Sequence, residues 1–167
     1  GTNIKLADTR KTTPGLRIFE KYAFKCGGGV NHRMGLYDAA MIKENHIAWT
    51  DNLNNAVKKI RLNSPFTTHI IIEAENIEQA KEAVLAGADS VLLDELSPEI
   101  IKKNVQELRD LSMNSLKKEV NKNLIIEVSG INPEEISKYL IKGIDLISTS
   151  SSITKSNWID LSMRYIN

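Results

Sequence analysis

Six short apolar segments recur along the chain, and each is followed by a stretch with the periodicity of an amphipathic helix. The segments cover residues 4–8, 40–44, 69–75, 90–94, 124–129 and 145–149. Strands that alternate with helices in this way usually run parallel, with the helices packed against the sheet. Closed barrels of this type have eight strands. Six strands therefore predict an α/β fold in the form of an open, TIM-like parallel barrel.

Helix boundaries between these segments are well marked. Asn76, Ser97 and Asn132 stand where a short polar side chain can cap a first helical turn, and the last two precede proline, which is favoured at the first helical position. Gly87 and Gly143 stand where helices are expected to end. These signals support the alternating order of strands and helices.

Polar residues stand at the carboxyl ends of the apolar segments. Five of the six ends carry ionisable or phosphate-compatible residues, namely Asp8-Thr9-Arg10, Lys43-Glu44, Asp94, Ser129-Gly130 and Ser148-Thr149-Ser150. The third segment carries Glu73 and Glu75 in its last half. In parallel α/β barrels these strand ends converge on one mouth, where the active site lies. The pattern therefore predicts a functional site at that mouth.

The segment KCGGGVNHR, residues 25–33, contains three consecutive glycines. It matches neither the dinucleotide-binding fingerprint nor a P-loop, because no Gly-Lys-Ser/Thr follows. Ordering three glycines is entropically unfavourable, so a specific geometry must require them. We expect the loop to reverse the backbone and direct His32 and Arg33 into the site. Cys26, beside the glycines, is expected to be a buried small residue.

The candidate site residues form three chemical groups. The cationic or potentially cationic group consists of Arg10, Lys11, His32, Arg33 and Lys43. Such a group predicts a polyanionic ligand, since arginine and lysine bind carboxylates and phosphates. Glu73 and Asp94 are two carboxylates suited to Mg²⁺, directly or through water. Small hydroxyl and glycine residues at 129–130 and 148–152 predict a monophosphate cradle.

Composition narrows the function classes. The net charge is +1, yet residues 1–50 hold eight Lys/Arg against four acidic residues, which again favours an anionic ligand near that part of the chain. Within it, Arg17, Lys21 and Lys25 at helical spacing are expected to lie on a solvated face. An aromatic content of 5% and the lack of a basic-aromatic stripe argue against nucleic acid, and no apolar run is long enough for a bilayer. The single cysteine excludes a disulfide framework and predicts a cytoplasmic setting.

Several motifs together resemble the quinolinate phosphoribosyltransferase family, also called nicotinate-nucleotide pyrophosphorylase (carboxylating). They are DTRKTTPGLR (8–17), GGGVNHRMGLYDAAMIKENH (27–46), the strand with Glu73, LLDELSPE (92–99) and IEVSGI (126–131). The resemblance implies a two-domain fold, in which an α/β sandwich precedes an open six-stranded barrel. Residues 1–167 are then a single catalytic barrel domain. The abrupt start inside the first strand leads us to expect a fragment of a longer chain.

The resemblance also implies a reaction and residue roles. Quinolinate and phosphoribosyl pyrophosphate react with Mg²⁺ to give nicotinate mononucleotide, pyrophosphate and CO₂, a step in making NAD. The family positions that bind the two carboxylates of quinolinate match Arg10, His32, Arg33 and Lys43. The implied catalytic residues are Lys11, Lys43, Glu73 and Asp94, of which Glu73 and Asp94 bind ribose hydroxyls and metal-associated water. The 5′-phosphate loops match Ser129, Gly130, Ser150 and Ser151. Lys155 stands where relatives commonly have histidine, so the exact residues of the last phosphate loop, 148–155, remain open.

Three alternatives stay open from the sequence. A related barrel phosphoribosyltransferase could act on another pyridine acid, although four cationic positions favour two carboxylates over one. A non-catalytic anion-binding barrel is less compatible with the Glu73/Asp94 pair in a basic mouth. The fragment alone could also be inactive, since in the family a partner subunit's N-terminal domain completes the site. That arrangement implies a homodimer or higher homo-oligomer for the full-length protein.

Overall fold

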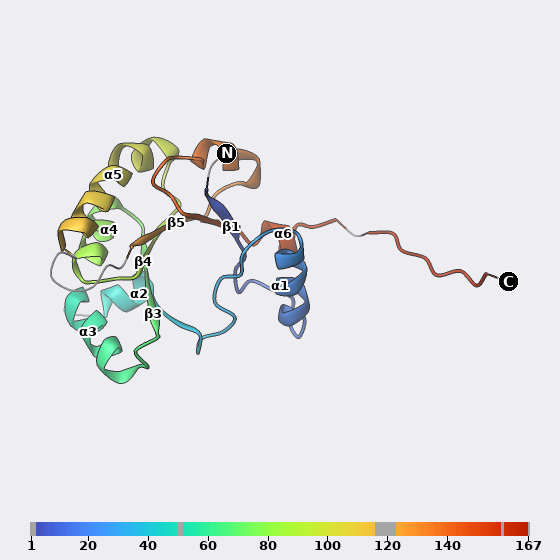
Figure 1. Ribbon diagram of the computed structural model, residues 1–167, viewed down its shortest axis with the longest axis horizontal. Coiled ribbons are helices and arrows are strands. Elements are labelled where there is room, and N and C mark those ends of the chain that lie inside the picture. The colour runs from blue at the N-terminus through green and yellow to red at the C-terminus, as the bar shows by residue number, and fades with distance from the viewer. Residues whose placement is uncertain (1–2, 50–51, 116–122, 158, 167) are drawn as a thin grey trace.

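The computed structural model describes residues 3–49, 52–115, 123–157 and 159–166, and six strands and their helices make up its body (Figure 1). The strands are β1 (Lys5–Ala7), β2 (Ala39–Ile42), β3 (His69–Ala74), β4 (Ser90–Asp94), β5 (Ile125–Ser129) and β6 (Leu146–Ser148). The α-helices are α1 (Arg17–Cys26), α2 (Glu44–Ala48), α3 (Leu53–Asn63), α4 (Ile77–Leu85), α5 (Pro98–Ser115) and α6 (Ser151–Thr154). A 3₁₀ helix, η2 (Pro133–Tyr139), lies between β5 and β6.

The six strands form one fully parallel sheet in the order β1-β6-β5-β4-β3-β2. All six strands predicted from the sequence are therefore confirmed, with small differences at their ends. β1 and β2 are the two edges of this sheet and do not pair with each other, so the barrel is open, as expected. Val30, from the glycine-rich loop, forms an isolated parallel bridge with Ala7 of β1. The loop thus occupies the side on which the barrel stays open.

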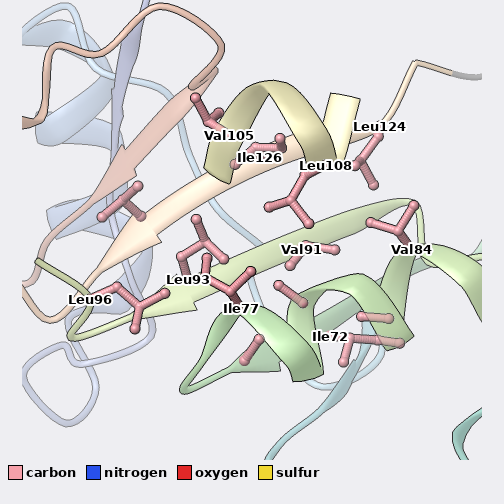
Figure 2. Close-up of a cluster of buried hydrophobic side chains, with 14 of the residues drawn as sticks. Ile72, Ile77, Val84, Val91, Leu93, Leu96, Val105, Leu108, Leu124 and Ile126 are labelled. Atoms are coloured by element: carbon pink, nitrogen blue, oxygen red, sulfur yellow. The ribbon is translucent and has the colours of Figure 1, made fainter. Parts of the chain in front are cut away.

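Alternation along the strands separates two faces of the sheet. The outer face carries fully buried aliphatic residues such as Ile72, Leu93 and Ile126, which belong to one large core cluster with residues of α4 and α5 (Figure 2). Burying one such side chain contributes about 1.5–3 kcal/mol, so this layer supplies most of the stabilisation. The inner face carries a much smaller apolar cluster, Ala39, Ile71 and Leu92, with Met41 against it. Above that cluster the inner face becomes polar.

The helix signals read from the sequence are largely confirmed. The side chain of Asn76 accepts a hydrogen bond from the backbone of Gln79 at the start of α4. Asn132 caps the next element in the same way, but that element is a 3₁₀ helix and not an α-helix. Gly87, just beyond α4, has a φ of +86° and Gly143 a φ of +102°, a backbone region that glycine adopts without strain.

Two arginines hold the amino-terminal edge of the sheet. Arg61 of α3 donates to the carbonyl oxygens of Thr68 (2.9 Å) and Gly87 (3.4 Å) and pairs with Asp89. Arg109 of α5 makes the same kind of contacts with the carbonyls of residues 124 and 143 and with Asp145. The carboxyl edge is thereby left for the functional site. No described helix has the length and apolar character needed to cross a membrane.

Candidate active site

A cavity of about 460 Å³ opens at the carboxyl ends of the strands. The residues assigned individual roles from the sequence all line it, as do Ser148 and Thr149 of the predicted phosphate cradle, whereas Ser152 of that cradle does not. The lining also includes Thr9, Met41, Leu92, Glu95, Glu127 and Ile131. The fold thus brings together residues that lie up to about 140 positions apart in the sequence. Lys155 does not line this cavity. The roles of the lining residues stay predictions until they are tested.

The glycine-rich loop directs His32 and Arg33 into the cavity, as the sequence predicted. Gly28 has a φ of +93°, and a Cβ added to Gly29 would lie 2.1 Å from the ring of Phe24. Two of the three glycines are therefore required by backbone geometry or by close approach. The prediction for Cys26 was wrong, because this residue is exposed at the last position of α1.

Arg10 and Arg33 give the side of the cavity near β1 and β2 a strong positive charge. The Nε atom of Arg10 is buried and has no hydrogen-bond partner. Arg33 donates to the carbonyl of Ala39 at 2.9 Å and contacts the sulfur of Met41 at 3.4 Å. Burial and the neighbouring charge of Arg10 lower the pKa of the Arg33 guanidinium. Among the described residues, no carboxylate pairs with either arginine within 4.0 Å, so both are available to an anion.

His32 contacts Glu127, a residue that the sequence analysis missed. The Nδ1 atom of His32 accepts a hydrogen bond from the backbone of Arg33 at 2.7 Å, which assigns the ring proton to Nε2. That Nε2 lies 3.3 Å from Glu127 Oε2. Glu127 is only 2% exposed, and its Oε1 has no hydrogen-bond partner. The sequence contains one signal that could have identified Glu127. It is a charged residue inside an apolar run, whereas buried parallel strands are normally apolar throughout.

Carboxylates from β3, β4 and β5 line the opposite side. Glu73 accepts a hydrogen bond from Lys43 at 2.6 Å, and Asp94 accepts one from the hydroxyl of Ser129. Burial is the main cause that raises the pKa of Glu73, and its hydrogen bond with Lys43 acts in the opposite direction. Glu73 is the more buried of the two partners, with 10% of its side chain exposed against 44% for Lys43. Lys43 therefore keeps a solvent-facing charge that can also reach a ligand.

The ends of β5 and β6 carry small polar residues, as predicted. Gly130 has a φ of +71°, and a Cβ there would lie 2.5 Å from the Glu95 side chain. A larger residue is thus excluded where the loop turns beside Asp94. After β6, the hydroxyl of Thr149 accepts a hydrogen bond from the backbone of Ser151 at 3.1 Å. This part of the cavity offers hydroxyl groups and backbone, and it also contains Asp94, which is bonded to Ser129, and Glu95, which lies beside Gly130.

The structure corrects the prediction for two of the three basic residues of α1. Lys25 is exposed, as expected, but Lys21 is 0% exposed and pairs with the equally buried Asp8. Arg17 is half-buried and donates to Thr12 Oγ1 at 3.0 Å. The prediction failed because the face of α1 that carries these two residues packs against polar loops and not against solvent.

Comparison with known proteins agrees with this geometry. Residues 1–164 match the family model described as quinolinate phosphoribosyl transferase, C-terminal domain. A probable nicotinate-nucleotide pyrophosphorylase (carboxylating) from Methanothermobacter thermautotrophicus is 42% identical over 161 residues, covering 96% of this chain and 55% of that protein. A protein of the same name from Synechocystis is 37% identical, covering 97% of this chain and 52% of its own.

Solved structures give the same result. The crystal structure of NadC from Streptococcus pyogenes has a TM-score of 0.83 and 38% identity, covering 98% of this chain and 53% of that one. The nicotinate-nucleotide pyrophosphorylase of Francisella tularensis has a TM-score of 0.78 and 38% identity, covering 91% and 50%. This chain spans about half the length of these relatives. By sequence and by fold, it belongs to the C-terminal domain family of quinolinate phosphoribosyl transferases.

Proposed function

We propose that this chain provides the catalytic barrel of a carboxylating nicotinate-nucleotide pyrophosphorylase. The reaction transfers the phosphoribosyl group of phosphoribosyl pyrophosphate to the nitrogen of quinolinate, with loss of CO₂. The products are nicotinate mononucleotide and pyrophosphate. Family membership supports this proposal, and the distribution of charge in the cavity is the structural observation that carries it.

That distribution separates the two arginines from the carboxylates, whereas Lys43 and His32 lie between them and contact Glu73 and Glu127. Arg10 and Arg33 lie on the β1–β2 side without carboxylate partners among the described residues. Two guanidinium groups held close together repel each other unless an anion lies between them. A ligand with two carboxylates satisfies both, whereas a monocarboxylate leaves one buried cation unpaired, which is costly. The two arginines thus favour quinolinate over nicotinate, and the presence of Glu73 and Asp94 in the same cavity favours an enzyme over a non-catalytic anion-binding barrel.

Lysine side chains extend the cationic side. Lys11 is exposed at the rim of the cavity, where we propose that it meets the leaving pyrophosphate. Lys43 has 44% of its side chain exposed and is proposed to contact quinolinate while it stays bonded to Glu73. As point charges on flexible stems, both can follow the movement of charge from the ribose to the leaving group.

The carboxylate side suits the ribose. Positive charge develops at the ribose carbon as pyrophosphate leaves, and fixed carboxylates stabilise it. We propose that Glu73 and Asp94 also accept hydrogen bonds from ribose hydroxyls. Holding the pyridine nitrogen and this carbon in one cavity makes the displacement effectively intramolecular. Once the ring nitrogen is alkylated, its positive charge accepts the electron pair left by the departing 2-carboxylate.

Mg²⁺ fits this site only if the protein and the substrate phosphates both contribute ligands to it. Within the part of the chain that the structure describes, no three His, Cys, Asp or Glu side chains form a metal-binding group. Glu73 and Asp94 are two oxygen donors, and Mg²⁺ is commonly bound by one or two carboxylates, water and substrate phosphates. We propose that they hold the ion in this way, mostly through water. When bound, it neutralises charge on the pyrophosphate.

We place the 5′-phosphate at the ends of β5 and β6. Ser129, Gly130, Ser150 and Ser151 line that part of the cavity, where hydroxyl groups and the backbone of two loops can bind a phosphate. The remaining context follows from the family: we propose that the full-length protein acts in the cytoplasm as a homo-oligomer.

Calorimetric titration of the chain with quinolinate and with nicotinate tests the proposal. We expect quinolinate to bind at least about tenfold more tightly, equivalent to about 1.4 kcal/mol. Equal affinities, or a preference for nicotinate, would refute a two-carboxylate site. Absence of binding to either ligand would refute a dicarboxylate site formed by the residues of this barrel without a partner domain.

A further inference from the structure

Helix α1 contacts both loops that carry the cavity's cations, although its own residues do not line the cavity. Arg17 and Lys21 are four positions apart and so lie on one face of the helix. Arg10 and Lys11 belong to the loop after β1, and His32 and Arg33 to the loop after the glycines. Neither the family roles nor the mechanism above assigns anything to this face of α1.

Lys21 fixes the backbone on both sides of His32. Its ammonium pairs with Asp8 and donates to the carbonyl of His32 at 3.0 Å. Asp8 in turn accepts a hydrogen bond from the backbone N–H of His32 at 2.8 Å. Asn31 completes the network, since its amide donates to Asp8 at 2.6 Å and to the carbonyl of Lys21 at 2.8 Å. The ion pair is fully buried, so water does not compete for the contact between the two side chains.

Arg17 connects the two cationic loops directly. One guanidinium nitrogen donates to the carbonyl of Arg10 at 3.3 Å, and the other to the carbonyl of Met34 at 3.4 Å. Its Nε donates to Thr12 Oγ1 at 3.0 Å. A single rigid, planar group thereby links the backbones next to Arg10 and Arg33. Repulsion between those two arginines acts to separate the loops, and this link opposes it.

We propose that Arg17 and Lys21 are positioning residues that set the separation of Arg10 and Arg33, and thereby make the site selective for a dicarboxylate. The inference rests on the proposed function, because it assumes that both arginines bind one ligand. The physical reason is preorganisation: a ligand with two charges gains from a fixed spacing, because it does not have to order the loops on binding. A ligand with one carboxylate needs only one of the two loops.

The test compares Arg17→Gln with a matched control, Arg61→Gln. Arg61 also bridges two loop carbonyls, of Thr68 and Gly87, but at the opposite edge of the sheet. For each variant, titration gives the affinities for quinolinate and nicotinate, and thermal unfolding gives the stability. We expect Arg17→Gln to lower the quinolinate-to-nicotinate affinity ratio by about tenfold or more, with nicotinate affinity little changed. Arg17→Lys keeps the positive charge but loses the planar group that bridges two carbonyl oxygens, so its affinity ratio should lie between those of wild type and Arg17→Gln.

Hydrogen exchange in the ligand-free variants separates this inference from the proposed function. Arg17→Gln should speed exchange of the backbone amides at residues 9–12 and 31–34 and leave the central strands protected. If wild type shows no preference for quinolinate but these amides respond, the proposed function and the selectivity derived from it fail, whereas the role of Arg17 in holding the two loops stands. If the amides do not respond, or if Arg61→Gln lowers the affinity ratio as much as Arg17→Gln, the positioning role is refuted.

Discussion

Replacing Arg33 with methionine separates the stability of the fold from the affinity of the site. Methionine keeps an unbranched side chain of similar length but removes the charge and the donors to Ala39 and Met41. Burial and the charge of Arg10 lower the pKa of Arg33, which means that the folded protein disfavours this charge. We therefore expect the melting temperature of Arg33→Met to equal or exceed that of wild type.

Affinity should change in the opposite direction. Removing one partner of a desolvated charge pair weakens binding by about 2–5 kcal/mol, equivalent to roughly 30-fold to several thousand-fold in the Kd for quinolinate. Arg33→Lys keeps the charge and loses the bidentate geometry. Its loss should be nearer the value of one charge-assisted hydrogen bond, about 1.5–3 kcal/mol.

Isothermal titration with quinolinate, paired with thermal unfolding of the same samples, measures both quantities. A Kd for Arg33→Met within about threefold of wild type, less than 1 kcal/mol, would show that Arg33 does not contact the ligand. A large loss of affinity together with a large loss of stability would show that the guanidinium is structural, and would refute the reasoning from its lowered pKa.

Three further perturbations test other parts of the site. Lys21→Met should destabilise the fold by about 3–5 kcal/mol by leaving a buried charge unpaired, and the double variant with Asp8→Asn should recover most of this loss in denaturant unfolding. Lys43→Met should raise the pKa of Glu73 further, because it removes the hydrogen bond that lowers it. A carboxyl group whose pKa is raised in the folded state makes the free energy of unfolding fall as pH rises above its ordinary pKa of 4.5, so in this variant the free energy of unfolding should keep falling to a higher pH than in wild type. An unchanged NMR titration of Glu73 would contradict this. Glu127→Gln removes a buried charge with one unpartnered oxygen, so it should leave stability equal or higher and tighten quinolinate binding, and weaker binding would be the contrary result.

The strands and the location of the site could be predicted because both depend on local patterns. Each apolar run is long enough for one strand, and Asp94 or Ser129 at its end follows from strand direction alone. Glu127 shows where that approach stops. In the sheet it lies beside Leu92 of β4 on one side and Leu146 of β6 on the other. A rule that considers only strand ends does not detect a charged residue in the middle of a strand.

Lys21 and Arg17 were mispredicted for a different reason. Basic residues four positions apart on a helix give the same pattern whether they face water or a buried carboxylate. What decides between these environments is Asp8, 13 positions away from Lys21, together with a loop carbonyl contributed by residue 32. Such a contact depends on how the loop packs, and loop packing leaves no periodic signal. The same limit applies to η2, since a capping asparagine and a proline begin 3₁₀ and α-helices alike.

The open side of the barrel explains why the two arginines of this site are separated from its carboxylates. Carboxylates come from the inner face of the paired strands β3, β4 and β5, where neighbouring backbones hold them rigidly. Arg10 and Arg33 come from loops at the unpaired edge, because without a β1–β2 pairing only loops can supply side chains there. Loops are less rigid than strands, so the edge needs another support, and the face of α1 that carries Arg17 and Lys21 contacts both loops. An incomplete barrel can thus give an anion and a developing cation separate, fixed positions in one cavity, which is the arrangement that the proposed phosphoribosyl transfer to a dicarboxylate would use.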